Sequence, residues 1–310
     1  DAKLLLKGAK KPLTAKYYGS DNGKNGKTGI RSKEELDRIL ADLEGCSYVV
    51  DEVKKGERIK KAPIPFTTST MQQEASKALN FSTQKTMRLA QQLYEGVEVK
   101  GHGTIGLITY LRTDSTRIAE EADATARAFI KEQYGEKYVI KNEQSKKNGG
   151  KIQDAHEAIR PSNVNLTPED IKKSLTAEQY KLYKLIWSRF LACQMASAVY
   201  DSVSIEVASA GYTFRATHSA LKFSGYTAVY VEGKDEEEEA FQSPLPDLKE
   251  GEALKLEALK PDQHFTQPPS RYTEATLIKA LEEKGIGRPS TYAPTISTIL
   301  DREYVVKEGK

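Results

Sequence analysis

The pattern of apolar residues changes twice along this chain, and the order of the changes is the strongest constraint on its fold. Residues 1–69 contain the alternation that is typical of strands, most clearly at 48–53. Residues 70–197 instead carry apolar residues three or four positions apart, as amphipathic helices do. Alternation returns in residues 198–266, for example at 203–207. Strands that stop, give way to helices and then resume indicate a helical domain inserted into a β-rich one.

We therefore predict an α+β, multidomain chain. The β-rich domain is discontinuous and consists of residues 1–69 and 198–266, and the inserted helical domain consists of residues 70–197. Residues 267–310 form a third part, in which two helices are joined by GIGRPST and followed by a short strand at 304–306.

Short polar residues that precede apolar runs predict where several helices begin. A side-chain oxygen at such a position accepts a hydrogen bond from an otherwise free N–H group of the first turn. Glutamine three residues later strengthens the signal, as Gln73 does after Thr70. The predicted N-caps are Thr70, Ser82, Ser115 or Thr116, Thr167 and Thr176.

Composition excludes some classes of protein. No apolar run approaches the ~18 residues that a membrane span needs, so we expect no membrane partner. The two cysteines, Cys46 and Cys193, belong to no CxxC pair, which argues against a zinc site and a disulfide framework. With 47 basic and 44 acidic residues, the net charge of +3 neither requires nor excludes a nucleic acid.

The stretch DNGKNGKT, residues 21–28, ends like a phosphate-binding P-loop. Asp21 stands where that motif has its first glycine, and an aspartate there repels phosphate and prevents the backbone from wrapping it. We therefore favour a Gly/Asn hairpin loop over a nucleotide site. The acidic run at residues 235–239 is likewise interpreted as a solvated loop.

A tyrosine beside several polar residues marks the sequence GLITYLRTDST, residues 106–116. We predict a strand at 107–111, which places Tyr110 and Arg112 on the same face. His156 and Arg160 are four residues apart, so on a helix they also share a face. A phenol with an ordinary pKa of about 10 needs a proton acceptor, and cations on the phosphate, to attack phosphorus. These residues together can form a phosphate clamp around a tyrosine.

The same residues also have a structural interpretation. A tyrosine in a strand usually packs, and a neighbouring arginine usually reaches solvent. A single histidine such as His156 is more often structural than a phosphate ligand. On local chemistry alone, packing is the more frequent role of Tyr110, so both interpretations stand at this point.

Four blocks of sequence resemble one family in order and spacing. GLITYLRTDS resembles the active-site strand of type IA DNA topoisomerases, in which the tyrosine becomes linked to a DNA 5′-phosphate. Residues 66–96 resemble the segment before that strand, QDAHEAIRPS resembles the block after it, and residues 268–299 resemble a later segment that binds single-stranded DNA. The resemblance covers most of residues 45–310. It is closest to bacterial DNA topoisomerase I, because Leu111 stands where topoisomerase III members usually have proline.

The resemblance implies a role for each matching residue. Tyr110 would be the nucleophile, forming a 5′-phosphotyrosine and releasing a 3′-hydroxyl. Arg112 would hold the scissile phosphate and stabilise the charge that develops on it. His156 and Arg160 would contact phosphate or support the site, and Glu157 would orient its neighbours.

Three further residues of the first block are assigned less directly. We favour a structural role for Asp114 and Ser115, as residues that begin the helix after the tyrosine. Thr113 stays open between a supporting role in the site and a purely structural one. Transesterification keeps the energy of the phosphodiester in the bond between tyrosine and DNA. Religation therefore needs no ATP, in agreement with the rejected P-loop.

The last block implies contacts with DNA. Ser290 would cap the second helix of this part, and a helix N-terminus suits a phosphate. Arg271 and Arg288 would bind DNA, and Tyr272 or Tyr292 would stack on a base. The alternative is a helix–turn–helix packing unit with Tyr292 in its core.

The family also has parts for which this sequence shows no counterpart, namely the Toprim domain that binds catalytic Mg²⁺ and the C-terminal zinc ribbons. We therefore interpret the chain as an internal fragment that comprises a toroidal arch, the inserted tyrosine domain and part of a helical DNA-binding domain. We expect no cofactor or metal in the fragment, and no efficient DNA cleavage or relaxation by it alone. The implied setting is a monomer in the bacterial cytoplasm, at the nucleoid, acting on single-stranded and negatively supercoiled DNA. The alternative function is a non-catalytic scaffold that binds single-stranded DNA.

Overall fold

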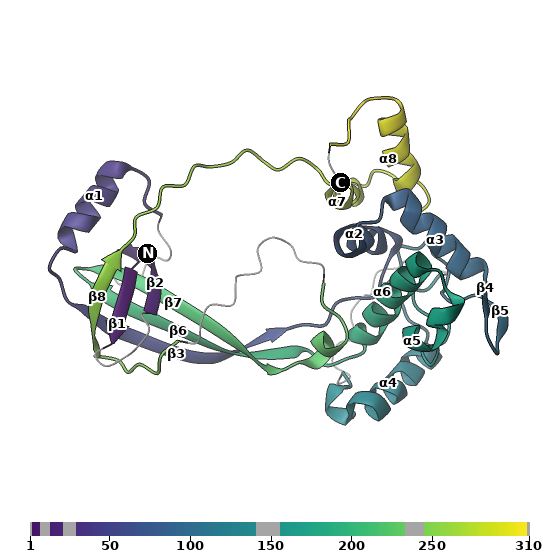
Figure 1. Cartoon of the computed structure of the whole chain (residues 1–310), viewed down its shortest axis with the longest axis horizontal. Helices are drawn as coiled ribbons and strands as arrows, with labels where there is room; N and C mark the ends of the chain where they lie inside the picture. Colours follow the sequence, from purple (N-terminus) through teal and green to yellow (C-terminus); the bar gives the residue numbers. More distant parts are fainter. Residues whose placement is uncertain (1, 7–12, 21–28, 141–155, 233–244, 309–310) are drawn as a thin grey trace. The chain divides into compact units, whose positions relative to one another are not determined.

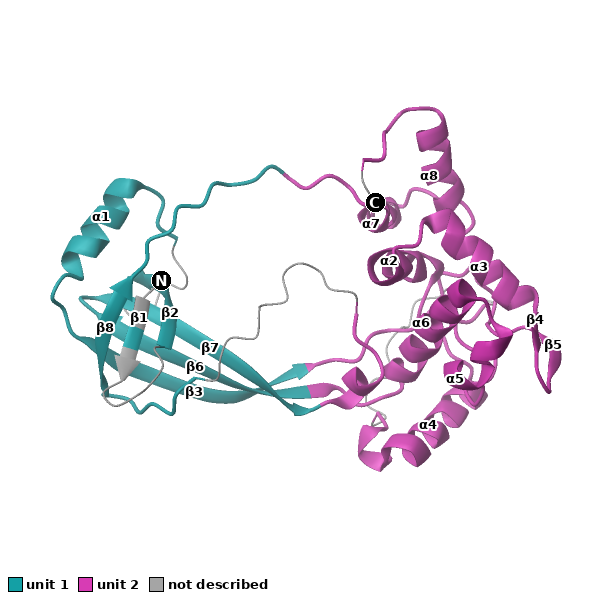
Figure 2. Cartoon of the chain, in the orientation of Figure 1, with its two compact units in different colours: residues 1–59, 199–223, 239–268 teal, residues 60–198, 224–238, 269–310 magenta. Residues whose placement is uncertain are grey.

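The structure is a computed structural model that describes residues 2–6, 13–20, 29–140, 156–232 and 245–308 (Figure 1). The chain divides into two compact units (Figure 2). Unit 1 consists of residues 1–59, 199–223 and 239–268, and unit 2 of residues 60–198, 224–238 and 269–310. The division into an arch, an inserted domain and a partial DNA-binding domain stays a prediction. The predicted loops at 21–28 and 235–239 lie outside the described residues.

Unit 1 is built on a closed β-barrel whose described strand pairs are antiparallel. Around the barrel the strands follow the order β1 (Ala2–Leu6), β2 (Leu13–Ser20), β7 (Tyr212–Phe223), β6 (Ala198–Ser209), β3 (Tyr48–Lys60) and β8 (Ala253–Leu259). The alternation seen at 48–53 and 203–207 is confirmed as strand. A single helix, α1 (Lys33–Asp42), begins after Ser32, whose side chain accepts a hydrogen bond from the Glu35 N–H group.

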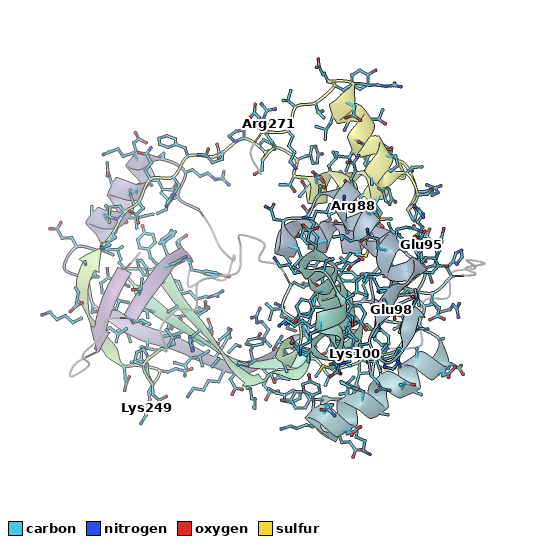
Figure 3. The ribbon with its side chains drawn as sticks, turned by 45° about the vertical axis from the view of Figure 1, so that its right-hand side comes forward. Arg88, Glu95, Glu98, Lys100, Lys249 and Arg271 are labelled. Atoms are coloured by element: carbon cyan, nitrogen blue, oxygen red, sulfur yellow. The ribbon has the colours of Figure 1, made fainter. Side chains whose placement is uncertain are left out.

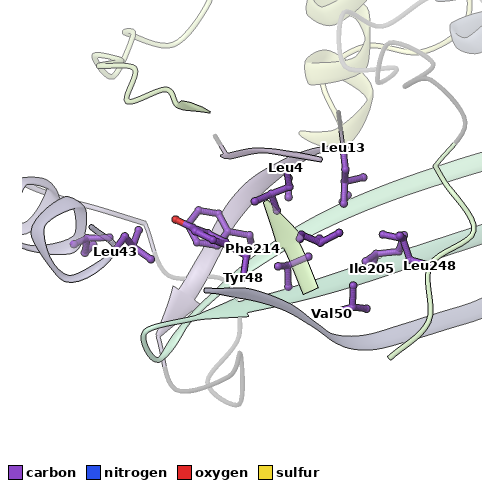
Figure 4. Packing of buried hydrophobic residues seen from close by; sticks show 13 residues of the cluster. Leu4, Leu13, Leu43, Tyr48, Val50, Ile205, Phe214 and Leu248 are labelled. Atoms are coloured by element: carbon purple, nitrogen blue, oxygen red, sulfur yellow. The ribbon is translucent and has the colours of Figure 1, made fainter. Parts of the chain in front are cut away.

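Side chains at every second strand position form the core of the barrel (Figure 4). Tyr48 and Val50 of β3, Ile205 and Val207 of β6, and Phe214 of β7 are all at most 2% exposed. Burying one such side chain stabilises a fold by about 1.5–3 kcal/mol. The same cluster contains Leu4, Leu13, Ala15, Ile39, Leu43, Ala216, Leu248 and Leu254.

Unit 2 is mainly helical, as predicted for residues 70–197. Its α-helices are α2 (Thr68–Leu79), α3 (Thr83–Glu95), α4 (Glu120–Tyr134), α5 (Pro168–Ile171), α6 (Ala177–Cys193), α7 (Glu274–Glu283) and α8 (Tyr292–Asp301). Among the described residues, short 3₁₀ turns are also present at Glu136–Tyr138, Lys172–Ser174 and Gly225–Ala228. A small hairpin of β4 (Val97–Val99) and β5 (Gly103–Ile105) follows α3. The chain is thus a mixed α and β protein with an antiparallel sheet.

Several predicted helix starts are confirmed, and the predicted start of α2 is wrong. Ser82, Thr167 and Thr176 are the N-caps of α3, α5 and α6, and their side chains accept hydrogen bonds from first-turn N–H groups. Helix α2, in contrast, is capped by Thr67 rather than Thr70. Thr70 is the partner in this capping box, because its side chain accepts a hydrogen bond of 2.9 Å from the Thr67 N–H group. A threonine hydroxyl can thus fill the place usually taken by Glu or Gln.

The predicted strand at 304–306 is also wrong. The chain turns back at the end of α8, where Glu303 has a left-handed φ of 55°. The Tyr304 N–H group then donates to the Ile299 carbonyl at 2.9 Å, which closes the helix end as a C-terminal cap. Within the ranges that the structure describes, none of the helices combines the length and the apolar character required to cross a membrane.

Candidate functional site

The segment around Tyr110 is an irregular loop and not the predicted strand. Its backbone groups bond to three different partners, so no continuous ladder forms. The Leu107 N–H group donates to the Leu93 carbonyl of α3 at 2.7 Å, and the Thr109 N–H group donates to the Arg160 carbonyl at 2.9 Å. Between them Ile108 and Pro161 form an isolated bridge, which is not extended because the Leu107 N–H group bonds to α3 and the Arg160 N–H group bonds to the Thr109 side chain.

His156 and Arg160 do not lie on a helix, which corrects the second geometric prediction. Residues 156–160 are a bend followed by irregular chain, in which Ile159 forms an isolated bridge with Phe66. The physical reason is Pro161, because a residue that precedes proline is disfavoured in helical conformation. The prediction that these two side chains share one face of a helix is therefore wrong. Arg160 instead bonds to Glu157, as described below.

The structure nevertheless brings Tyr110 and His156 together, in unit 2. The centroids of their rings are 5.0 Å apart, with an interplanar angle of 39°. Tyr94, from the last turn of α3, approaches Tyr110 with a centroid separation of 5.5 Å and an angle of 66°. Tyr110 is half-buried, whereas His156 is exposed. The phenol therefore lies between a histidine and a second tyrosine.

Arg112 is held by helix α3. Its Nη1 donates to Oε1 of Gln91 at 3.2 Å, and Nε2 of Gln91 donates to Oε1 of Glu95 at 2.6 Å. An arginine has five N–H donors in a planar fork, so this single bond fixes the guanidinium and leaves donors for an anion. The partly buried Arg112 is thus a cation close in sequence to Tyr110 and tied to the helix that carries Tyr94.

Thr113 and Ser115 are buried and organise the loop. The Thr113 N–H group donates to Oγ1 of Thr68 at 2.9 Å, and that Thr68 hydroxyl donates to the Leu111 carbonyl at 2.7 Å. The side chain of Thr113 accepts from the Ser115 N–H group at 3.0 Å. Thr113 therefore makes structural bonds within the loop, and a supporting role in the site stays a prediction.

The expected caps for the helix after the tyrosine are wrong. Helix α4 begins at Glu120, after Ala119, so Asp114, Ser115 and Thr116 precede it by several residues. Ser115 forms a local turn instead, accepting from the Arg117 N–H group at 3.2 Å. Such side-chain bonds to nearby backbone compete with helix formation. Asp114 is exposed.

Glu157 ties this loop to the start of α4. Its Oε2 accepts from the Ala119 N–H group at 3.1 Å and from Nε of Arg160 at 2.8 Å. Burial opposes the charge of Glu157, but these hydrogen bonds, with the charges of Arg160 and Arg117, lower its pKa below the ordinary value. Arg160 also donates through Nη1 to the Pro161 carbonyl at 3.0 Å. Both side chains therefore serve the architecture of the site.

Replacing Glu157 by Gln is expected to lower the melting temperature of the chain at pH 7 by about 2 °C. Because the folded-state pKa is lowered, the carboxylate stabilises the fold above its unfolded pKa of about 4.3, and this contribution is lost as pH falls through the folded pKa. The difference between Glu157→Gln and wild type should therefore shrink below about pH 4. Thermal melts followed by circular dichroism across pH 3.5 to 7 measure it.

Glu132→Gln is the matched control, because Glu132 is exposed on α4. It should leave the melting temperature unchanged at every pH. A Glu157→Gln difference that stays constant from pH 7 to pH 3.5 contradicts the assignment.

The C-terminal part places its predicted residues in different environments. Tyr292 is 6% exposed and packs with Ile278 and Ile296, so the structure favours the packing alternative for this ring. Helix α8 begins at Tyr292 after Thr291, so Ser290 does not occupy the cap position that was expected of it. Arg288 is exposed. Its Nη1 donates to the Gly287 carbonyl at 2.7 Å, where Gly287 has a φ of 81°.

Helices α7 and α8 pack on the helices that lead to the tyrosine loop. Helix α7 lies beside α2 (Figure 1). Glu282 accepts from the Ser69 hydroxyl at 2.7 Å, and Glu274 accepts from the Thr83 N–H group at 2.8 Å. The predicted DNA-contacting segment is therefore bonded, within unit 2, to the first turns of α2 and α3.

Exposed charges near this region do not form one basic patch (Figure 3). Arg88 and Glu95 lie on α3, and Glu98 and Lys100 follow on and beside β4, so exposed cations and anions are mixed along this stretch. Arg271, which precedes α7, is exposed, as is the neighbouring ring of Tyr272 at 66%. The exposed charges along this stretch thus do not create a field of one sign.

Two comparisons with known proteins agree with this organisation. A family model described as DNA topoisomerase matches residues 7–310 of the chain. The chain belongs to the type IA DNA topoisomerase family. A solved structure of full-length topoisomerase I from Thermotoga maritima, in a monoclinic crystal form, is 41% identical with a TM-score of 0.73. The match covers 91% of this chain and 44% of that one, so the chain spans less than half the length of that relative.

The magnesium expected for a whole type IA topoisomerase has no fitting site among the described residues. Nowhere within them do three His, Cys, Asp or Glu side chains gather as a metal centre requires. The two candidate residues nearest Tyr110, Arg112 in sequence and His156 in space, carry nitrogen groups instead. They suit a phosphate and not a divalent cation.

Sequence reasoning missed Gln91 and Tyr94, whose side chains contact Arg112 and Tyr110. Both lie in the block at residues 66–96 that resembles the family, so that block was the available signal. Their contacts with Arg112 and Tyr110 join positions about a dozen or more apart across the β4–β5 hairpin, and single-sequence patterns do not reveal such pairs. Thr68, whose hydroxyl bonds to the loop at two points, was missed for the same reason.

Proposed function

We propose that the chain is the tyrosine-bearing part of a type IA topoisomerase that relaxes negative supercoils without ATP. The enzyme cleaves one DNA strand through a 5′-phosphotyrosine, passes a strand through the break and religates it. Membership of the family supports this proposal. The observation that carries it is the contact between the rings of Tyr110 and His156 within unit 2. Arg112, two residues after Tyr110 on the same loop, adds a guanidinium that is held by Gln91.

The proposed cleavage is a transesterification in which atoms balance. The phenol of Tyr110 loses its proton, and its oxygen attacks phosphorus. The bond from phosphorus to the 3′ oxygen breaks, and the released 3′ oxygen takes up a proton to become a hydroxyl. Arg112 stabilises the charge that develops on the phosphate oxygens, and His156, beside the phenol, binds the same phosphate. Religation is the reverse step, and no bond energy is lost between the two.

The proposed partners follow from the same chemistry. Single-stranded and negatively supercoiled DNA supply the strand, and the exposed Arg271 and Arg288 are the cations available to its backbone. Arg160 and Glu157 support the loop by their ion pair of 2.8 Å. Magnesium belongs to a Toprim domain outside this chain, and the enzyme acts as a monomer in the bacterial cytoplasm.

The isolated chain is expected to bind a labelled single-stranded oligonucleotide but to form no adduct that survives denaturation. The full-length protein with Mg²⁺ is expected to form one, linked to the DNA 5′-phosphate. The reason is that the metal-binding half of the proposed active site lies outside this chain. A native gel measures binding and a denaturing gel measures the adduct.

Robust relaxation of a supercoiled plasmid by the isolated chain contradicts the proposal that the reaction needs a metal-binding part outside this chain. Binding by the full-length protein without any adduct favours the non-catalytic scaffold instead.

A further inference from the structure

The last turn of α3 fixes the loop that carries Tyr110. The Leu93 carbonyl accepts from the Leu107 N–H group at 2.7 Å. A Cβ atom on Gly106 would lie 2.6 Å from the Tyr94 carbonyl oxygen, a separation that real side chains do not tolerate. Only a glycine lets the loop approach the helix this closely. The backbone at Tyr94 and the backbone leading to Tyr110 are therefore in direct contact.

The side chain of Tyr94 also contacts the phenol ring of Tyr110. Its ring lies 5.5 Å from that of Tyr110, at an angle of 66°, which is an edge-to-face geometry that aromatic pairs prefer. His156 approaches Tyr110 at 5.0 Å. A ring that contacts two aromatic neighbours has few rotamers open to it. Tyr94 thus restricts the directions in which the Tyr110 oxygen can point.

The same helix turn also holds the cation. Gln91 lies three residues before Tyr94, so the two side chains leave adjacent positions of α3. Gln91 bonds to Arg112 at 3.2 Å while Tyr94 contacts Tyr110. The nucleophile and its phosphate-binding partner are therefore set relative to each other by one rigid element. Placing reactive groups on a helix in this way limits their misalignment.

We infer that Tyr94 is a positioning residue for Tyr110, whose ring contact orients the phenol for in-line attack on the scissile phosphate; this inference rests on the proposed function. The contact is made by the ring and not by the hydroxyl, so phenylalanine retains it and an aliphatic side chain does not. Tyr94 is 39% exposed, so its replacement does not open a cavity in the core.

The test is single-turnover formation of the covalent adduct by the full-length protein at saturating oligonucleotide with Mg²⁺. Tyr94→Phe should react within about twofold of wild type, and Tyr94→Leu should react about ten- to a hundredfold more slowly, because small misplacements of reacting groups cost this much. The dissociation constant for the oligonucleotide should be unchanged in both. Tyr304→Leu, which changes a 71%-exposed tyrosine with no part in the site, should match wild type.

The outcomes separate the inference from the proposed function. An unchanged rate for Tyr94→Leu overturns the inference while leaving the proposed function intact. So does a raised dissociation constant with an unchanged rate at saturation, since that pattern means that Tyr94 contacts a base. A wild-type protein that forms no adduct overturns the proposed function and the inference with it. If the leucine variant does not fold, Tyr94→Gln takes its place, because glutamine is a good helix former without a ring.

Discussion

Replacing Tyr110 by Phe in the full-length protein is expected to reduce the covalent adduct by about 10⁶-fold, the loss seen when a covalent nucleophile is removed. Phenylalanine keeps the ring that contacts Tyr94 and His156 and deletes only the oxygen that bonds to phosphorus. Tyr110 is half-buried and contributes ring contacts that survive this change, so the melting temperature should stay the same. The adduct is measured on a denaturing gel with an oligonucleotide labelled on the 5′-phosphate side of the break.

Tyr304→Phe is the matched control, because it removes one hydroxyl from an exposed tyrosine of the same unit. It should form the adduct at the wild-type rate. If Tyr110→Phe still gives an adduct, another residue is the nucleophile and the assignment of the site fails. Binding of the oligonucleotide should be equal in all three proteins, which shows that the loss concerns bond formation and not recognition.

Two strands of the barrel could be predicted from the sequence because their pattern is local. Strands with one face in a core alternate in polarity, and this alternation located β3 and β6. Helix caps are also local, since a hydroxyl bonds to an N–H group two or three residues away. Ser82 and Thr176 were found for that reason. Thr67 was missed because its partner, Thr70, is a threonine where the motif usually has Glu or Gln.

The residues of the candidate site could be predicted from the sequence, but their geometry could not. Resemblance identified Tyr110 and His156. The strand predicted to align Tyr110 with Arg112 and the helix predicted to align His156 with Arg160 were both wrong. The closure of the barrel and the order of its strands were equally beyond a single sequence, because pairing depends on contacts between distant residues. The same holds for the ring pair of Tyr94 and Tyr110.

Pro161 shows how one residue decides this outcome. Its ring disfavours a helical conformation at Arg160, which precedes it, and Pro161 forms only an isolated bridge with Ile108. Two irregular segments therefore lie side by side, joined by bonds such as that from the Arg160 N–H group to Oγ1 of Thr109 at 3.0 Å. An irregular backbone can aim side chains in directions that a regular strand does not permit. Functional residues lie on such segments more often than on the elements that support them.

Replacing Arg112 by Ala in the full-length protein is expected to slow adduct formation by about 10²–10³-fold, the loss typical of removing one donor that stabilises transition-state charge. Arg112→Lys should recover only part of this rate, because an ammonium keeps the charge but lacks the planar fork. Single-turnover rates at saturating oligonucleotide measure both variants.

Arg88→Ala provides the matched comparison, since Arg88 is an exposed arginine on the same helix that holds Arg112 through Gln91 (Figure 3). Loss of a surface charge alone weakens DNA binding in proportion to the phosphates that the charge neutralises. Raising the salt concentration reduces the difference in affinity between the variant and wild type. Arg88→Ala should therefore change the dissociation constant by at most a small factor and leave the rate at saturation untouched. Equal effects of the two alanine variants would mean that Arg112 contributes only to the overall charge. A rate defect confined to Arg112→Ala, and insensitive to salt at saturation, places its guanidinium on the phosphate that Tyr110 attacks.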